Sequence, residues 1–462
     1  MFSAQIYATR RDRLKNDVGN GLILLLGNDE VGMNYRDNTL RYRQDSSFLY
    51  FFGLDKPGLT AIIDTENATE TIFGHENTLD DIIWSGPQPS LSELAARVGV
   101  AQVQPAKAIG AVLKAAQESG RDIHFLPPYR QTNAFKLHEW TGVSFFEMKT
   151  KASEKLIKAI IGQRAIKSDE EVLQLEEAVN ISGEMHLAAM QRTRDGMYEY
   201  EIVGHIQGAA LSRGGDLAYP IIFSTNGQTL HNHFHGNFME SGRLVLGDFG
   251  AENAMHYAGD ITRTIPVDKK FTAMQREIYD IVLEMEMQSI AALQPGVQYR
   301  EVHLAANRIM LDGLKQLGIV NGDVDEMLQL GVGGLFMPHG LGHSIGLDVH
   351  DMEDLGENYV GYRDGLPRST QLGLRSLRLA KELEIGNTLT VEPGIYFIPE
   401  LIDKYRAETQ FMDFVNYQQL EEYRTFGGIR IEDNCLITNE GSRVLGTPIP
   451  KTINEIETVR SL

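Results

Sequence analysis

Short apolar runs separated by turn-forming residues fill roughly the first 150 positions of the chain. The runs LILLL, SSFLYFFGL and LTAIID, which begin at Leu22, Ser46 and Leu59, have the length and composition of buried strands. Stretches with helical periodicity, such as LSELAARV and IGAVLKAAQ, fall between them. The pattern predicts an α/β domain. Because this domain has few histidines or clustered carboxylates, we expect it to support or gate a site that lies elsewhere.

A polar segment around residues 150–168 marks a change in the pattern. Ser168 and Glu171 have the spacing of a capping box, and apolar residues follow at helical spacing. We therefore predict two domains, residues 1–160 and residues 161–462. Further helices are predicted from three apolar sets: Ile202 and Ile206; Met274, Ile278, Ile281 and Met285; Val302, Ile309 and Leu317.

Strand-like runs lie between and after these helices, and they carry most of the candidate chemistry. The runs are LVLGDFGA, DITRTIPV, NTLTVEPGIYF and GIRIEDNCLIT. Asp248 ends the apolar part of the first run, and Asp260 opens the second, twelve positions later. If the two runs form a hairpin, both carboxylates can face one another at its open end. The alternative is a turn capped by two surface aspartates.

The segment PHGLGHSIGLDVHD, from Pro338 to Asp351, is too rich in glycine for a stable helix. It holds His339, His343 and His350, three of the 13 histidines of the chain. One imidazole could bind a metal while the other two donate hydrogen bonds to a substrate. The alternative for each is a structural histidine.

Two glutamates stand on strand-like runs near the C-terminus. Glu392 follows LTV and precedes Pro393, and Glu432 follows Arg430 on the same face of GGIRIEDN. Each could be an exposed acid at a strand end, but a charged pair on one face of an apolar strand needs a partner when it is buried. Four carboxylates and one imidazole favour two divalent ions of the manganese, cobalt or iron kind over a zinc ion held by cysteines.

Composition narrows the class of protein. The 462 residues are 42% hydrophobic and carry 63 acidic against 43 basic side chains, for a formal net charge of −20. Such a charge disfavours binding to nucleic acid or to anionic membranes. The single cysteine, Cys435, cannot form an intramolecular disulfide, and the early apolar run is too short to span a bilayer. We expect a cytoplasmic protein.

The order Asp248, Asp260, His343, Glu392 and Glu432 resembles the metal-ligand signature of the pita-bread metallopeptidases. The strings MPHGLGHSIGLDVHD, LTVEPGIYF and GGIRIEDN are similar to the proline-specific branch, which comprises prolidase and aminopeptidase P, and GLRSLRLAKELEIGNTLTVEPGIYF resembles prolidase in particular. The family usually spaces its two aspartates eleven positions apart, whereas the spacing in this chain is twelve positions. The resemblance covers essentially the whole chain and implies a creatinase-like N-terminal α/β domain before a pita-bread (α+β) catalytic domain.

The resemblance also implies roles for individual residues. Asp248, Asp260 and Glu432 would hold one metal, and Asp260, His343, Glu392 and Glu432 the other; manganese is the expected metal. His231, His339 and His350 match the substrate-contacting histidines, although His233 and His235 lie close to the first. Glu392 would transfer protons, Arg430 would hold the carboxylates in place, and Tyr396 matches an active-site neighbour. Arg378 matches an arginine that in prolidases faces the substrate's terminal carboxylate; alternatively it is a solvated helix residue beside Arg375 and Lys381.

The predicted activity is hydrolysis of the peptide bond before proline, with Xaa-Pro dipeptides preferred and longer Xaa-Pro peptides as the alternative. Its partners would be small peptides with proline at the second position, and we expect a homo-oligomer, either a dimer or a tetramer. Two other classes remain open. A metal-free hydrolase such as creatinase shares the fold but lacks the ligand set, and inactive binding proteins on the same fold lose ligands and often gain charged tails.

Overall fold

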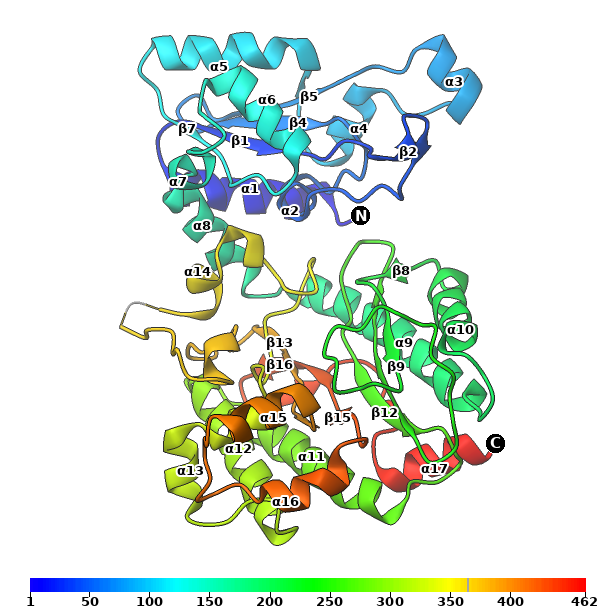
Figure 1. The fold of residues 1–462 in the computed structure, drawn as a ribbon. Coiled ribbons are helices and arrows are strands. Elements are labelled where there is room, and N and C mark those ends of the chain that lie inside the picture. Colours follow the sequence, from blue (N-terminus) through cyan, green and yellow to red (C-terminus); the bar gives the residue numbers. More distant parts are fainter. Residues whose placement is uncertain (364) are drawn as a thin grey trace. The chain divides into compact units, whose positions relative to one another are not determined.

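The computed structural model of the chain describes residues 1–363 and 365–462, which form two compact units (Figure 1). The first unit is residues 1–164 with the short segment 352–359, and the second is residues 165–351 with 360–462. The division after Arg164 lies close to the boundary proposed from the sequence, but the segment 352–359 joins the first unit instead of the second. In that unit, the ring of Tyr359 lies 5.6 Å from Nζ of Lys158.

A five-stranded mixed sheet in the order β6-β5-β4-β1-β7 organises the first unit (Figure 1). Leu22 and Leu24 alternate with Ile23 along β1, and they pack on Ile109 and Leu113 of α5. The strands are β1 (Leu22–Leu26), β4 (Thr60–Asp64), β5 (Thr69–Gly74), β6 (Gln102–Pro105) and β7 (Ile123–His124), with a separate hairpin of β2 (Gly32–Tyr35) and β3 (Asn38–Thr39). The helices are α1 (Ala4–Val18), α2 (Ser46–Phe52), α3 (Leu79–Ser85), α4 (Leu91–Arg97), α5 (Ile109–Glu118), α6 (Gln131–Thr141), α7 (Met148–Lys151) and α8 (Glu154–Arg164).

The strand predicted for SSFLYFFGL is wrong, because this run forms helix α2. Asp45 caps the helix by accepting a hydrogen bond from the Phe48 amide, and Gly53 ends it in the left-handed conformation with φ of 62°. Every residue of α2 is buried, so the run is apolar on all sides and carries no periodicity that could separate a buried strand from a buried helix.

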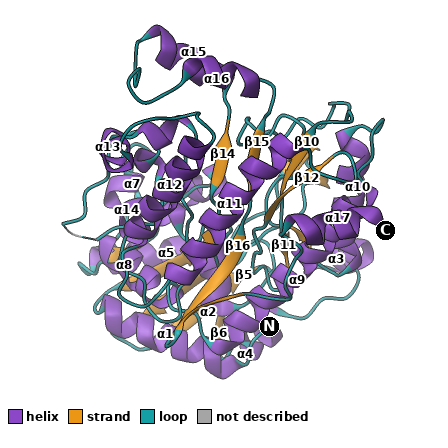
Figure 2. Cartoon of the chain, turned by 90° about the horizontal axis from the view of Figure 1, so that it is seen from below, coloured by secondary structure: helices purple, strands orange, loops and turns teal. Residues whose placement is uncertain are grey.

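The second unit consists of small antiparallel sheets surrounded by helices (Figure 2). The strand orders are β12-β10-β9, β11-β8, β13-β16-β17 and β14-β15. The strands are β8 (Asp216–Leu217), β9 (Ile222–Ser224), β10 (Leu244–Asp248), β11 (Ala251–Glu252), β12 (Thr262–Pro266), β13 (Thr388–Val391), β14 (Gly394–Tyr396), β15 (Gly428–Arg430), β16 (Asp433–Thr438) and β17 (Gly441–Val444). The helices are α9 (Asp169–Arg192), α10 (Glu199–Ser212), α11 (Ala273–Ala292), α12 (Tyr299–Gln316), α13 (Val324–Leu330), α15 (Pro399–Ala407), α16 (Tyr417–Leu420) and α17 (Ile453–Ser461). Helix α14 (Glu357–Gly361) begins in the segment 352–359, which belongs to the first unit.

The predicted helices of this unit are confirmed as α9 to α12. The amide of Ser168 donates to the Glu171 carboxylate at the start of α9, as the capping box requires. Ile278 and Met285 of α11 and Val302 of α12 enter one large hydrophobic core. The strand-like runs are also confirmed, as β10 to β12 and β13 to β16.

Two sheets meet where the candidate residues lie. Thr262, the first residue of β12, bridges to Glu432, which stands between β15 and β16. The β10–β12 pair therefore lies directly beside the strands that carry the C-terminal glutamates. No helix in the described part of the chain has the length and apolar character needed to cross a membrane.

Candidate functional site

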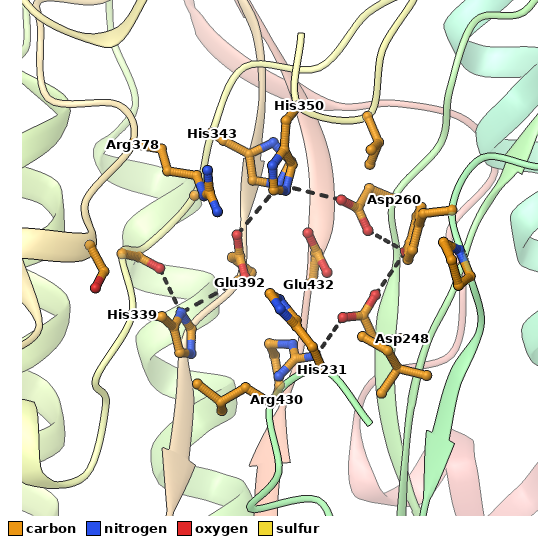
Figure 3. Close-up of a pocket in the computed structure, with 18 of the residues that line it drawn as sticks. His231, Asp248, Asp260, His339, His343, His350, Arg378, Glu392, Arg430 and Glu432 are labelled. Atoms are coloured by element: carbon orange, nitrogen blue, oxygen red, sulfur yellow. Dashed lines mark hydrogen bonds and ion pairs between the residues drawn. The ribbon is translucent and has the colours of Figure 1, made fainter. Parts of the chain in front are cut away.

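A cavity of about 400 Å³ in the second unit collects nearly all of the side chains singled out from the sequence (Figure 3). Ten of the predicted site residues line it: His231, Asp248, Asp260, His339, His343, His350, Arg378, Glu392, Arg430 and Glu432. Tyr396 is fully buried behind this lining. The first and the last of these residues, His231 and Glu432, are 201 positions apart in the chain, so only the fold brings them together.

Asp248 and Asp260 lie at the end of the β10–β12 pair where the chain connects the two strands. The predicted location at the open end of a hairpin is therefore wrong. Residues 249–261 link the two strands, and the carboxylates lie at the linked end. The hydroxyl oxygen of Tyr219 is within hydrogen-bonding distance of both carboxylates, at 2.7 Å from Asp248. A phenol has one proton, so satisfying both contacts as hydrogen bonds requires a proton on one of the acids. Burial raises the pKa of Asp248, and the charge of Asp260 adds to this effect.

His343 presents one ring nitrogen to the acidic cluster. Its Nδ1 lies 3.1 Å from the carbonyl oxygen of Ser344, so that nitrogen carries the proton and donates. Nε2 then lies 3.4 Å from Asp260 and 3.6 Å from Glu392. A proton on Nε2 makes the contact with Asp260 a donated hydrogen bond. When that proton is lost, the Nε2 lone pair points toward the carboxylates, which is the orientation that a metal-binding imidazole needs.

Glu432 is the most buried of the four acids, at 2% exposure. Its Oε2 accepts a hydrogen bond of 2.7 Å from the Thr262 hydroxyl, whereas its Oε1 is buried with no hydrogen-bond partner among the described residues. A buried carboxylate oxygen without a partner is costly. Asp260, His343 and Glu432 each offer a ligand atom within 4.8 Å of the others. The residues therefore fit a divalent cation, which would take up the orphaned oxygen.

The pKa shifts of the acids also favour a bound cation at this cluster. Burial raises the pKa of Glu432 well above its ordinary value, and the charges of Asp260 and Glu392 raise it further. Burial likewise raises the pKa of Glu392 to about 7. Burial opposes ionisation of Asp260 too, but its contact with His343 lowers its pKa overall. Acids that resist ionisation beside one another are stabilised as carboxylates only when a cation lies among them.

We expect the free energy of unfolding of the metal-free protein to fall as the pH rises from 4.5 to about 7. An acid with a higher pKa in the folded than in the unfolded chain binds its proton more tightly when folded, so stability is lost as that proton leaves. Each pKa unit corresponds to about 1.4 kcal/mol, so Glu392 should contribute a loss of a few kcal/mol. Urea denaturation of chelated protein at about pH 5 and about pH 7.5 measures the change.

Glu392→Gln is the matched control, because the amide has the same shape and no proton to lose. The free energy of unfolding of this variant should fall less between about pH 5 and about pH 7.5. Addition of divalent metal should reverse the trend for the unsubstituted protein, since metal binding needs the deprotonated acids. An equal decline in the glutamine variant would contradict the assignment of the effect to Glu392.

Arg430, Tyr396 and His339 form a continuous hydrogen-bonded row beside the acids. Arg430 donates to the Tyr396 hydroxyl at 2.7 Å and to the Asp248 carboxylate. The Tyr396 hydroxyl therefore donates its own proton to Nε2 of His339, 2.8 Å away. Nδ1 of His339 donates to the carbonyl oxygen of Gly340 at 2.7 Å and lies 3.8 Å from Glu392. Burial and the charge of Arg430 lower the pKa of His339 to about 3, so its imidazole is neutral.

The loop that carries three neighbouring histidines separates their roles. His231 and His233 line the cavity, whereas His235 bonds through Nε2 to the carbonyl oxygen of Ile221 at 2.9 Å. Burial and the nearby charge of Arg430 lower the pKa of His231. His235 therefore anchors the loop, and His231 and His233 remain at the cavity wall.

His350 and Arg378 lie on the wall next to His343 (Figure 3). The rings of His343 and His350 are 4.1 Å apart between centroids. Arg378 lies outside any helix and lines the cavity, whereas Arg375, three residues earlier, is exposed and belongs to a short 3₁₀ turn. This arrangement excludes the alternative that Arg378 is a solvated helix residue.

Sequence reasoning missed Tyr219 and Thr262, both of which contact the acids directly. Tyr219 is in an irregular segment between β8 and β9 with no motif around it, so only the fold could reveal it. Thr262 lies in the predicted strand DITRTIPV two positions after Asp260, so it shares a strand face with that acid. The two-residue spacing from Asp260 could therefore have identified Thr262 from the sequence.

Comparison with known proteins defines the class. Residues 174–439 match metallopeptidase family M24, and residues 7–124 match the N-terminal domain of aminopeptidase P. The chain belongs to metallopeptidase family M24. Its fold is the predicted one, an N-terminal α/β domain of the aminopeptidase P type followed by a pita-bread catalytic domain.

Individual relatives cover the whole chain. Xaa-Pro dipeptidase from Homo sapiens is 34% identical over 98% of this chain and 92% of its own length. A probable Xaa-Pro aminopeptidase from Fusarium vanettenii is 34% identical over 98% of this chain and 94% of its own. Aminopeptidase PepP from Pseudomonas aeruginosa superposes with a TM-score of 0.83 at 28% identity, over 100% of this chain and 98% of that one. Zinc-substituted aminopeptidase P from E. coli in complex with product gives 0.81 at 30% identity, with the same coverage.

Proposed function

We propose that this protein is a dinuclear-metal peptidase that hydrolyses the peptide bond before proline and prefers Xaa-Pro dipeptides. The observation that carries the proposal is the single cavity that holds the acidic cluster, the histidines and Arg378 together. A proline nitrogen has no hydrogen and its ring fixes φ, so a peptidase that recognises an extended strand through its N–H groups fits proline poorly. A site built from metal ligands and side-chain donors avoids that requirement.

Asp248, Asp260 and Glu432 would hold one cation, and Asp260, His343, Glu392 and Glu432 the other. When bound, the two cations would lower the pKa of a water molecule toward neutrality and polarise the scissile carbonyl. The carboxylates of Asp260 and Glu432 would serve both positions, and Arg430 and Tyr219 hold Asp248 in place through the contacts described above.

Glu392 is the candidate proton carrier. Its carboxylate lines the cavity beside His343 and His339, where it could accept a proton and return it. Glu392 would take a proton from the attacking water and deliver it to the proline nitrogen as the peptide bond breaks. His350 and His231 would donate to the carbonyl oxygen as negative charge develops on it. His339 has both ring nitrogens bonded within the protein, so we assign it to positioning Tyr396 and Glu392.

Arg378 provides the preference for dipeptides. A guanidinium pairs in a bidentate manner with a free carboxylate, and such a contact requires the chain to end immediately after proline. We expect Arg378→Ala to raise KM for a dipeptide such as Ala-Pro by about tenfold or more, the equivalent of at least one charge-assisted hydrogen bond. The effect on a tripeptide such as Ala-Pro-Gly should be small, because its carboxylate lies one residue further out. Steady-state kinetics of the manganese-loaded enzyme measures both.

Arg375→Ala is the matched control, since Arg375 is exposed three residues away and does not line the cavity. It should leave both substrates unaffected. If the unsubstituted enzyme cleaves Xaa-Pro tripeptides better than dipeptides and Arg378→Ala is silent on both, the activity is that of an Xaa-Pro aminopeptidase instead. The Fusarium relative is named a probable Xaa-Pro aminopeptidase, and the bacterial structures are named aminopeptidase PepP and aminopeptidase P.

Three further assignments complete the proposal. Manganese is the proposed metal, because hard oxygen ligands with one imidazole suit it. We place the protein in the cytoplasm, on the grounds of its one unpaired cysteine. We propose a homo-oligomer, either a dimer or a tetramer; exposed apolar side chains such as Trp84, which is 87% exposed, are compatible with association.

A further inference from the structure

His186, a buried histidine on α9, contacts the backbone immediately after each of the two aspartates of the site. Its Nε2 lies 3.1 Å from the carbonyl oxygen of Phe249 and 2.9 Å from that of Ile261. These residues immediately follow Asp248 and Asp260 in the chain. One imidazole nitrogen therefore joins the backbone next to one acid to the backbone next to the other.

The proton on this imidazole can be assigned. Both partners of Nε2 are carbonyl oxygens, which only accept, so Nε2 carries the hydrogen and its bond is shared between them. Burial lowers the pKa of His186 to about 3, so the ring stays neutral at the pH of ordinary assays. The ring is stacked on Phe249 with centroids 3.9 Å apart and planes 11° from parallel, which fixes its orientation.

Ser182 supports the same connection one helical turn earlier. Its hydroxyl donates to the Ala178 carbonyl and accepts a hydrogen bond of 2.9 Å from the Ala251 amide. The segment 249–261 packs closely against α9 at this point. A Cβ atom at Gly259 would lie only 2.7 Å from the hydroxyl oxygen of Ser182. Ser182 and His186 thus form a pair on one face of α9, and both are fully or nearly fully buried.

The two aspartates depend differently on this support. Asp248 is the last residue of β10 and pairs with Ile222 on one side and Thr262 on the other. Asp260 precedes β12 and lies outside that ladder. Its amide donates to Asn434 at 2.9 Å, and its neighbour Ile261 is held by His186. Backbone bonds from the Phe249 amide to Ile261 and from the Gly259 amide to Ala251 also join the two sides of this connection. Asn434 and the Ser182–His186 pair add side-chain support that helps to fix Asp260 relative to Asp248.

We propose that Ser182 and His186 are positioning residues that fix the Asp248 and Asp260 carboxylates at the separation needed to bind two cations together. The inference rests on the proposed dinuclear site and deepens it, because it assigns the control of metal binding to a helix that has no side chain in the cavity. Partners of metal ligands typically change metal affinity by about ten- to a hundredfold when they are replaced.

The test compares His186→Phe with His186→Gln. Phenylalanine keeps the stacking on Phe249 but removes the N–H group, whereas the glutamine amide can place an N–H close to the position of Nε2. Calorimetric titration of chelated protein with manganese gives the affinities of both ions, and electron paramagnetic resonance reports the magnetic coupling of the bound pair. We expect His186→Phe to weaken at least one ion by about tenfold or more and to alter the coupled spectrum, and His186→Gln to restore much of both.

His303→Phe is the matched control, since His303 is another buried histidine of the same unit, on α12, and it accepts a hydrogen bond from Asn307. It should lose thermal stability without losing metal affinity. Should His186→Phe not fold, Ser182→Ala decides, with an expected weakening of several-fold. Two ions bound as tightly as in the unsubstituted protein, with the same spectrum, would overturn the inference. Failure of the unsubstituted protein to bind two ions would instead overturn the dinuclear site.

Discussion

Replacing Glu432 with alanine should remove both metal ions and reduce peptidase activity by on the order of a thousandfold or more. The reason is the position of its carboxylate, which is buried beside Asp260 and His343 and has one oxygen without a partner among the described residues. Because Glu432 is a ligand in both proposed metal positions, its removal should weaken both positions together. Elemental analysis of the purified variant, together with Ala-Pro hydrolysis before and after addition of manganese, gives both results.

Chelation of the unsubstituted protein should have the same effect on activity, and manganese or cobalt should restore it. The matched control is Glu199→Gln, because Glu199 is equally buried in the same unit but its oxygens accept from the Thr225 amide and the Asn237 side chain. That variant should retain two ions per chain. Full activity in protein shown to be free of metal, or two ions retained by Glu432→Ala, would contradict the shared-ligand assignment.

The second large effect is expected at His350. Its alanine variant should keep both metal ions and lose about a hundredfold or more in kcat, the usual cost of removing one preorganised donor from a reacting oxygen. The ring lies on the cavity wall against His343, with 4.1 Å between their centroids. It is therefore placed to reach a bound substrate, while His343 faces the acids.

His233→Ala is the control for this prediction, because His233 also lines the cavity but has no proposed contact with the reacting carbonyl. Its kcat should remain within about threefold of the unsubstituted value. Metal loss from His350→Ala would identify His350 as a structural support of His343, and unchanged kinetics would remove it from the mechanism.

The amino-acid sequence by itself determined the elements and the residue types of the site. Apolar spacing located α9 to α12, and the strand-like runs became β10, β12, β13 and β16, because periods of two and 3.6 residues follow from local backbone geometry. The metal-ligand candidates came from their order in the chain and from the strings around them. Chain order is independent of how the segments pack, and so the five candidate ligands could be proposed without coordinates.

Only the tertiary structure decided which side chains meet. SSFLYFFGL forms a helix that the sequence did not reveal, because an apolar run buried on all sides has no period to separate helix from strand. Asp248 and Asp260 lie at the linked end of their strands. The structure also distinguished Arg378 from Arg375, because Arg378 lines the cavity whereas Arg375 belongs to a short 3₁₀ turn. Tyr219 and His186 lie on other segments, 41 and 75 positions from the residues they contact, Asp260 and Ile261. Such contacts depend on packing between distant segments, and no local pattern of residues encodes them.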